Sequence, residues 1–248
     1  MRRALLLIDR GSREEEVKEE LRYICEKVKL KGNYHFSDYC FLEVVPPYIE
    51  EGINKCLSQN VDALTIVPYF LYHGRKVKAA VNTAIKLQAE TNVKFTISRP
   101  MSLHKSLIKI VDEKISTVLK KNEIHIPKDR VNILLIGHGS KDPNARMSLM
   151  YVSEGLADLY RAVKYCFLEI EEPNIKQGIE MSAKDNPTLL VVVPYFLHKG
   201  AHVKRDIHED LDPAIASSYV KNILISEHLG TDDIMIDLVL ERAREVEL

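Results

Sequence analysis

Two histidines and one glutamate in the second half of the chain have the residue types and spacing of a metal site. His138 follows an apolar run and stands between two glycines, Glu169 follows a second apolar run, and His202 follows a third. If these runs are neighbouring parallel strands, the three side chains meet at the carboxyl edge of one sheet. Two imidazoles and a carboxylate suit Fe²⁺, Co²⁺, Ni²⁺ or Zn²⁺, and three ligands leave a coordination position open.

The same side chains can also move protons. A neutral imidazole, at His138 or His202, can accept a proton near pH 7, and Glu169 can take a proton or steady the metal. His198 precedes His202 by four residues and shares its face if that loop is helical. We therefore include His198 among the residues that could contact a bound substrate.

The stretch around His138 has a degenerate copy near residue 10, at an offset of 128 residues (138 − 10). Two further blocks repeat at an offset of 126 residues (165 − 39 and 193 − 67). The matched blocks are residues 5–13 with 133–141, 39–43 with 165–169, and 67–71 with 193–197. Three blocks in one order indicate an internal duplication of about 126 residues.

The two copies differ at the residues that would bind the metal. Arg10 stands where His138 stands, Lys76 stands where His202 stands, and Glu43 is retained. Because permanent cations do not bind a metal ion, the second half must hold the site, or the protein has lost activity. Arg10 and Lys76 are either kept to bind an acidic substrate or are the result of drift in a half that has lost its site.

The elements that position these residues alternate between apolar runs and helical periodicity. Strands are predicted at residues 4–8, 39–45, 63–67 and 93–97, and helices at 13–29, 48–57, 77–89 and 103–119. This β-α alternation implies a parallel sheet covered by helices on both faces. Residues 120–130 are polar and contain Pro127, so they are the expected linker between an N-terminal domain, residues 1–122, and a C-terminal domain, residues 123–248.

Composition excludes several classes of protein. Of 248 residues, 46% are hydrophobic and 29% charged, with a formal net charge of −1, so no global field favours nucleic acid or an anionic membrane. The four cysteines form no C-x-x-C pair, which argues against zinc knuckles and iron–sulfur clusters and favours a reducing compartment. No apolar run approaches the roughly 18 residues of a membrane span. We expect a cytoplasmic protein.

The motifs together resemble those of the class II tetrapyrrole chelatases, the sirohydrochlorin ferrochelatase and cobaltochelatase group. The residues that carry the resemblance are G-H-G-S-K at 137–141, F-L-E-I-E-E-P at 167–173, and V-V-P-Y-F-L-H-K-G-A-H-V-K-R-D-I at 192–207. The resemblance implies two similar α/β domains, each a parallel four-stranded sheet flanked by helices, with the active cleft between them. It places the family's metal-binding and catalytic residues on His138, Glu169 and His202.

The resemblance also implies a substrate, the acidic tetrapyrrole sirohydrochlorin, and a divalent metal as second substrate, with no organic cofactor. Fe²⁺ is the expected metal, with Co²⁺ and Ni²⁺ as alternatives. Polar residues of the motif loops are the predicted contacts for the substrate carboxylates: Arg10, Lys76, Ser140, Lys141 and His198. Other interpretations are a non-catalytic metal or tetrapyrrole carrier and a nucleotide site at the glycine turn, which lacks a third glycine. The expected assembly is a monomer or homodimer.

Overall fold

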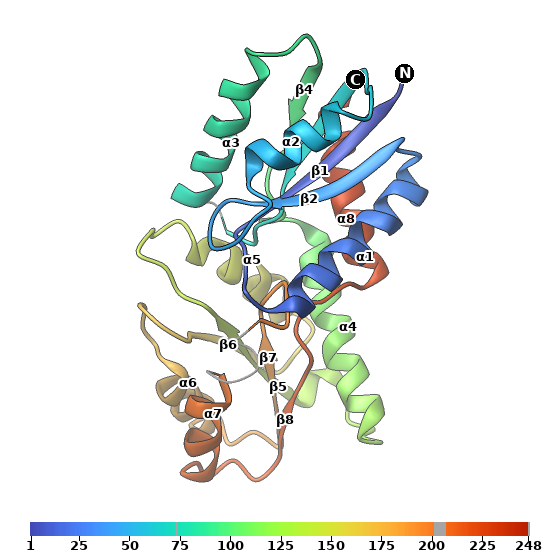
Figure 1. Cartoon of the computed structure of the whole chain (residues 1–248). Helices are drawn as coiled ribbons and strands as arrows, with labels where there is room; N and C mark the ends of the chain where they lie inside the picture. Colours follow the sequence, from blue (N-terminus) through green and yellow to red (C-terminus); the bar gives the residue numbers. More distant parts are fainter. Residues whose placement is uncertain (73, 201–206, 248) are drawn as a thin grey trace. The chain divides into compact units, whose positions relative to one another are not determined.

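The computed structural model of this protein describes residues 1–72, 74–200 and 207–247. The chain forms two compact units: one comprises Met1–Ser102 and Thr231–Leu248, and the other comprises Leu103–Gly230. Each unit contains one four-stranded sheet in which every strand pair is parallel (Figure 1). The predicted fold class, two similar parallel α/β sheets flanked by helices, is confirmed.

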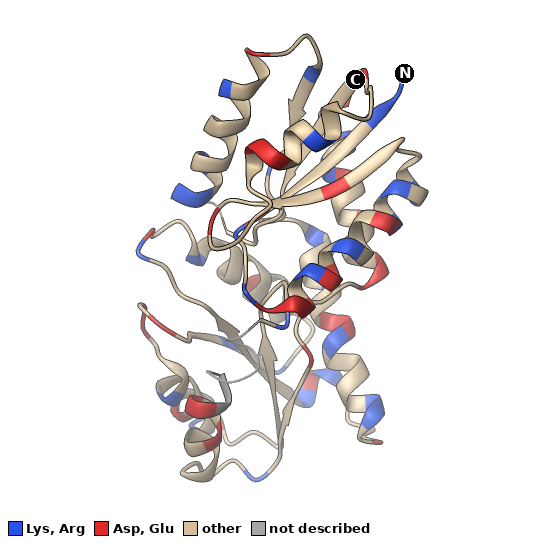
Figure 2. Ribbon diagram, in the orientation of Figure 1, with Lys and Arg blue, Asp and Glu red and all other residues tan. Residues whose placement is uncertain are grey.

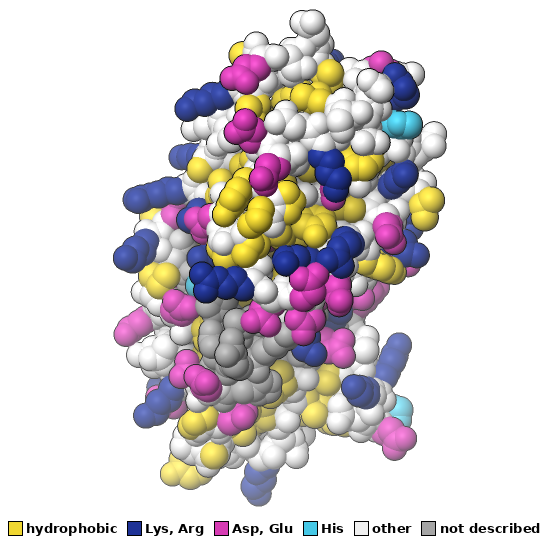
Figure 3. Space-filling view, in the orientation of Figure 1, with side chains coloured by type: hydrophobic (Ala, Val, Ile, Leu, Met, Phe, Trp, Pro, Cys, Tyr) yellow, Lys and Arg dark blue, Asp and Glu magenta, His cyan; other side chains and the backbone are white. Residues whose placement is uncertain are grey.

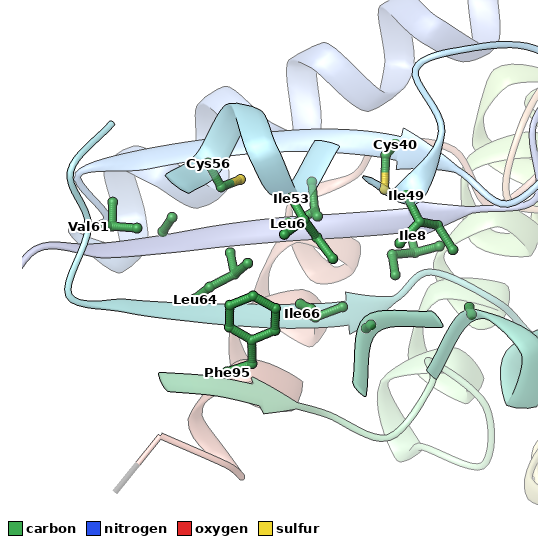
Figure 4. Close-up of a cluster of buried hydrophobic side chains, with 13 residues drawn as sticks. Leu6, Ile8, Cys40, Ile49, Ile53, Cys56, Val61, Leu64, Ile66 and Phe95 are labelled. Carbon is green, nitrogen blue, oxygen red and sulfur yellow. The ribbon is translucent and has the colours of Figure 1, made fainter. Parts of the chain in front are cut away.

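The first sheet has the order β2-β1-β3-β4. Its strands are β1 (Arg3–Asp9), β2 (Phe36–Phe41), β3 (Ala63–Pro68) and β4 (Lys94–Ile97), and the helices of this segment are α1 (Glu15–Gly32), α2 (Ile49–Leu57) and α3 (Arg75–Gln88). Strands β1 and β3 are nearly continuous apolar runs, as expected for parallel strands that helices cover on both faces. Figure 4 shows one face of this core, where Leu6, Ile53 and Ile66 are at most 1% exposed.

The second sheet repeats this topology with the order β6-β5-β7-β8. Its strands are β5 (Val131–Gly137), β6 (Ala162–Phe167), β7 (Leu189–Pro194) and β8 (Ile223–Ile225); its other elements include α5 (Arg146–Ala157), α6 (Ile175–Ala183), α7 (Ile207–Ala216) and the short helix η1 (Lys128–Arg130). The strand register is also repeated. Leu7 pairs with Tyr39 and Val67, and its counterpart Leu135 pairs with Tyr165 and Val193, as the duplication predicts.

The last helix of each repeat packs in the unit of the other repeat. Helix α4 (Lys105–Lys121) contacts α5 and β7, whereas α8 (Asp233–Arg244) contacts α1 and β3. The helix predicted at residues 103–119 thus ends the first copy of the repeat but lies in the second compact unit. The apolar face of α4, which includes Leu107, Ile110 and Ile115, is buried in the second unit. The domain boundary predicted between residues 122 and 123 divides the two copies of the sequence repeat and stays a prediction. The compact units of the structure are divided elsewhere, after Ser102 and after Gly230.

Strand β2 ends at Phe41, four residues before the predicted end at residue 45. The N–H of Phe41 donates to the carbonyl of Pro47, and Val44 has a φ of 77°, so the chain has left the extended conformation by that point. Two consecutive prolines, at positions 46 and 47, lack the N–H groups that a further ladder would need. The residues after Phe41 therefore form a loop, which carries Glu43.

Charged side chains lie mainly on the helices and loops. Figure 2 shows Lys and Arg interspersed with Asp and Glu along α1 and α4, while most strand residues are uncharged. This distribution follows from burial of both faces of each sheet, since an unpaired charge is costly in an apolar interior. None of the described helices is long and apolar enough to cross a membrane.

Candidate metal centre

Backbone hydrogen bonds hold His138 beside Glu169 at the carboxyl edge of the second sheet. Past the end of β6, the N–H of Leu168 donates to the carbonyl of Gly137, the last residue of β5, at 2.9 Å, and that of Glu169 donates to the carbonyl of His138 at 3.0 Å. The pairing of β5 with β6 therefore continues beyond both strands. The two side chains belong to neighbouring loops whose spacing is set by a backbone ladder.

Gly139 makes this close approach of the two loops achievable. Its φ is 91°, and a Cβ built on it would lie 1.9 Å from the carbonyl oxygen of Glu169. Gly11 has the same role in the first unit, with a φ of 106° and a Cβ that would lie 2.1 Å from the carbonyl oxygen of Glu43. Only glycine tolerates both the positive φ and the backbone contact.

The side chains of His138 and Glu169 lie close enough for both to contact one ion. Nε2 of His138 lies 3.7 Å from Oε1 of Glu169. An ion about 2.0 to 2.2 Å from each atom in tetrahedral geometry would separate them by about 3.4 Å. Nδ1 of His138 lies 3.3 Å from the Gly139 carbonyl, which can only accept. In the neutral tautomer that donates Nδ1–H to this carbonyl, the lone pair is on Nε2, the nitrogen nearer Glu169.

The imidazole of His138 packs against an aromatic ring, whereas the carboxylate of Glu169 is open to solvent. The His138 side chain is 21% exposed and its ring packs at 58° against the ring of Phe196, with the centroids 6.4 Å apart. The Glu169 side chain is 46% exposed. The imidazole is thus held in one orientation, while the carboxylate can be reached from solvent.

The structure describes three of the four other predicted site residues of the second half. His202 lies outside the described residues, and within them no group of three His, Cys, Asp or Glu side chains is placed to hold a metal ion. His198 is half-buried in the loop after β7, and Lys141 is exposed. Ser140 donates its N–H to Oε1 of Glu171 at 3.0 Å, and its Oγ accepts from the N–H of Asp142 at 3.0 Å. The contacts given for Ser140 therefore organise the turn, and its role in substrate binding stays a prediction.

A further carboxylate, to which the sequence motifs gave no role, braces this turn. Glu171 is 11% exposed at its side chain and accepts from Ser140 N–H and from Nε and Nη2 of Arg146, the latter two at 2.8 and 2.7 Å. The guanidinium of Arg146 also lies 5.4 Å from the ring centroid of Phe167. Val45 occupies the equivalent position in the first half (171 − 126), and this break in the repeat was the available signal.

Replacing Glu171 by glutamine is expected to lower the free energy of unfolding by about 1 to 3 kcal/mol, because the guanidinium of Arg146 loses its anionic partner. It should also slow metal insertion, since the brace fixes the turn that carries His138. The measurements are urea unfolding and initial rates. Glu172→Gln is the matched control, because that side chain is exposed; equal stability of the two variants would contradict the assignment of Glu171 as a brace.

In the first half, the residues equivalent to the predicted ligands form an ion-pair cluster. Nε of Arg10 lies 3.1 Å from Oε1 of Glu43, and Nζ of Lys76 contacts Oε2 of the same carboxylate. The two side chains that replace histidines thus supply positive charge to the retained glutamate. Both are 53% exposed, so the cluster is accessible from solvent.

These contacts predict a small pH dependence of stability. The hydrogen bond from Lys76, and then that from Arg10, lowers the pKa of Glu43 below its ordinary value. A glutamate whose pKa is lower in the folded protein than in the unfolded chain, where it is about 4.3, stabilises the fold at pH values above about 4.3. This contribution is lost as the pH falls through the pKa that Glu43 has in the folded protein. Exposure of all three side chains limits it to less than about 1 kcal/mol.

The expected result is that Glu43→Gln unfolds at lower urea concentration than the wild type at pH 7, and that this difference disappears near pH 3. Glu50→Gln is the control, because Glu50 is an exposed acidic residue on α2. A difference that persists unchanged at the lower pH would show that it does not arise from ionisation of Glu43.

Comparison with known proteins connects both halves to one family. The CbiX family model matches the chain twice, over residues 4–118 and 132–246. The chain belongs to the CbiX family. The family consists of class II chelatases, so the predicted resemblance is confirmed. The two CbiX matches are also the two copies of the repeat, one with Arg10, Glu43 and Lys76 and one with His138, Glu169 and His202.

Individual CbiX relatives match over most of their length. A sirohydrochlorin ferrochelatase of Priestia megaterium is 26% identical over 235 residues, which is 93% of this chain and 85% of the relative. A sirohydrochlorin cobaltochelatase of Sulfolobus acidocaldarius is 31% identical over 115 residues, 46% of this chain and 91% of the relative. The structure of SirB from Bacillus subtilis with Fe³⁺ has a TM-score of 0.84, covers 99% of this chain and 95% of its own, and is 23% identical; it supports the fold.

Proposed function

We propose that this protein is a sirohydrochlorin ferrochelatase, which inserts Fe²⁺ into sirohydrochlorin, with His138, Glu169 and His202 as metal ligands and catalytic residues. The observation that carries the proposal is the 3.7 Å separation of His138 Nε2 and Glu169 Oε1 at the ends of neighbouring strands. This arrangement occurs in a chain of the CbiX family whose relatives include sirohydrochlorin ferrochelatases. The metal is a substrate in this reaction and leaves with the product.

Support for His202 comes from the internal repeat. In the first half, Lys76 contacts Glu43, and Lys76 is the residue equivalent to His202 (202 − 126). A residue at this position of the repeat is therefore within reach of the glutamate at the end of the second strand. Equivalent placement in the second half would complete a set of two imidazoles and one carboxylate.

The chemistry requires exchange of metal ligands and loss of two protons. The pyrrole nitrogens of the macrocycle replace the protein ligands on the metal, and each pyrrole N–H involved gives up its proton as a metal–nitrogen bond forms. The Nε2 lone pair of His138 either binds the metal or accepts such a proton once the metal has moved to the macrocycle. Glu169, which is partly open to solvent, can pass a proton onward. Three protein ligands also hold a metal less firmly than a closed structural site does.

The substrate carries carboxylate side chains, and we propose that Arg10 and Lys76 bind them, with Lys141 and His198 as further contacts. All of these residues lie in loops that follow the carboxyl ends of strands or at the helix start after such a loop. Charge-assisted contacts between guanidinium or ammonium groups and carboxylates are among the strongest hydrogen bonds in proteins. The alternative is that Arg10 and Lys76 only pair with Glu43.

A second candidate is the same reaction with Co²⁺, because the CbiX relatives include cobaltochelatases. His and carboxylate ligands suit both ions, so the residues do not choose between them. Ni²⁺ is the remaining metal alternative. A carrier without catalysis is the alternative from another class, motivated by the loss of histidines from the first half.

The test is an anaerobic assay in which protein, sirohydrochlorin and one divalent metal are mixed and the absorption bands of the pigment are followed. The expected result is many turnovers per protein molecule with Fe²⁺. Faster turnover with Co²⁺ or Ni²⁺ would assign the enzyme to that metal. A change limited to one equivalent of pigment per protein would favour a carrier instead.

A further inference from the structure

A strained turn follows the glutamate in both halves. The N–H of Glu171 donates to the carbonyl of Glu169 at 2.7 Å, and Ile170 between them has a φ of 69°. In the first half, the N–H of Val45 donates to the carbonyl of Glu43 at 3.0 Å around Val44, whose φ is 77°. A hydrogen bond from residue i + 2 to residue i around a central residue of positive φ is the γ-turn that proteins seldom use, because it is strained.

The central residue is of the wrong type for such a turn. Seven described residues other than glycine have a positive φ, and only Val44 and Ile170 among these seven are β-branched. Such side chains clash with the backbone in this region, whereas Gly, Asn and Asp tolerate it. Three of the remaining five are Asn, as that preference predicts. The aliphatic side chain therefore makes the turn less favourable locally.

Burial in the core does not offset this strain. Val44 is 44% exposed and Ile170 is 56% exposed, so much of each side chain faces solvent. Figure 3 shows hydrophobic side chains gathered on the surface of the first unit over α2 and the loop between β2 and α2, the loop that contains Val44. An exposed aliphatic residue in a strained conformation points to a contact with something outside the unit.

The two copies of this loop differ directly after the turn, but both have a β-branched aliphatic residue at its centre. Val45 and Pro46 correspond to Glu171 and Glu172 (171 − 126 and 172 − 126), so the loop exchanged apolar for acidic residues. Position 44 and its counterpart 170 kept a β-branched aliphatic side chain. Ile170 directly follows Glu169 and thus stands at the rim of the candidate metal centre.

We propose that Ile170 is an apolar contact for the face of the tetrapyrrole macrocycle and positions the ring beside Glu169 and His138. This inference rests on the proposed function, because it takes the substrate from it. A tetrapyrrole has a flat, largely apolar face and carboxylates at its periphery, so it needs an apolar contact as well as cations. The side chain of Ile170 supplies the first, and Lys141, an exposed cation in the loop after β5 of the same unit, can supply the second. Ile170 is a positioning residue and takes no part in proton transfer.

The decisive variant is Ile170→Asn, because asparagine adopts a positive φ readily and is polar. It should keep the turn and leave the melting temperature unchanged or raised. Burial of an aliphatic side chain against the ring predicts that its loss weakens binding of metal-free sirohydrochlorin about three- to tenfold, measured by equilibrium absorption titration. The KM for sirohydrochlorin should rise equally, with kcat and the metal dissociation constant unchanged. Ile170→Val should behave like the wild type.

Leu159→Ala is the matched control for loss of an exposed aliphatic side chain. Leu159 is 43% exposed and lies in the turn before β6, at the opposite edge of the sheet from Glu169. It should leave pigment binding unchanged. Unchanged pigment binding in Ile170→Asn would overturn the inference, as would weaker binding in Ile170→Asn matched by an equal loss in Leu159→Ala. A wild-type protein that binds no sirohydrochlorin would overturn the proposed function, which is a distinguishable failure.

Discussion

His138→Ala is expected to lower the turnover number for metal insertion by at least about 100-fold, because the change removes the proposed metal ligand and proton acceptor at once. Glu169→Ala and His202→Ala should have effects of similar size. The His138 side chain is 21% exposed, and the backbone ladder that holds its loop does not involve the imidazole. The variant should therefore fold normally, as a thermal melt followed by circular dichroism would check.

The matched comparison is Glu43→Ala, at the equivalent position of the first half. Glu43 is already paired with Arg10 and Lys76, so it is occupied by cations of the protein and should contribute little to metal binding. Its loss should lower turnover much less than loss of Glu169 does. The reverse order would place the metal site in the first half, and full activity of both His138→Ala and His202→Ala would refute the ligand assignment.

Removing Arg10 and Lys76 together is expected to raise the KM for sirohydrochlorin by roughly tenfold or more, since each charge-assisted contact is worth about 1.5 to 3 kcal/mol. Glu43 holds both cations side by side, and because both are about half exposed, a substrate carboxylate can approach the cluster. The formal charge of the three groups is +1, so the cluster still attracts an anion.

Turnover and the KM for the metal should change little in the Arg10→Ala, Lys76→Ala variant, because neither cation is a metal ligand. Steady-state rates with the pigment and the metal varied separately would measure these quantities. Lys86→Ala is the control, because Lys86 is an exposed cation in the last turn of α3, the helix that begins near Lys76. An unchanged KM for sirohydrochlorin in the double variant would mean that the two cations serve only Glu43.

Much of the architecture followed from local sequence patterns. Apolar runs separated by helical periodicity gave parallel sheets, because parallel strands are buried on both faces and need helical crossovers. The repeat then placed His138 and Glu169 at the ends of strands with equivalent roles. Their proximity could be predicted because β5 and β6 are neighbours whose carboxyl ends meet at one edge. The expected substrate and metal were inferred from the resemblance of the sequence motifs to a family, and such motifs give no distances between side chains.

Contacts between distant residues were decided only by the tertiary structure. The apolar stripes of α4 and α8 predict that each helix packs on a sheet but do not say on which one, and the folded chain places each in the unit of the other repeat. Periodicity likewise did not reveal that Arg10 and Lys76 share Glu43 or that Glu171 braces the turn at Ser140. These pairings join side chains on separate loops, and their geometry depends on a backbone that only the folded sheet supplies. The turn at Ile170 is a further case, since residue preferences argue against its positive φ and the surrounding fold imposes it.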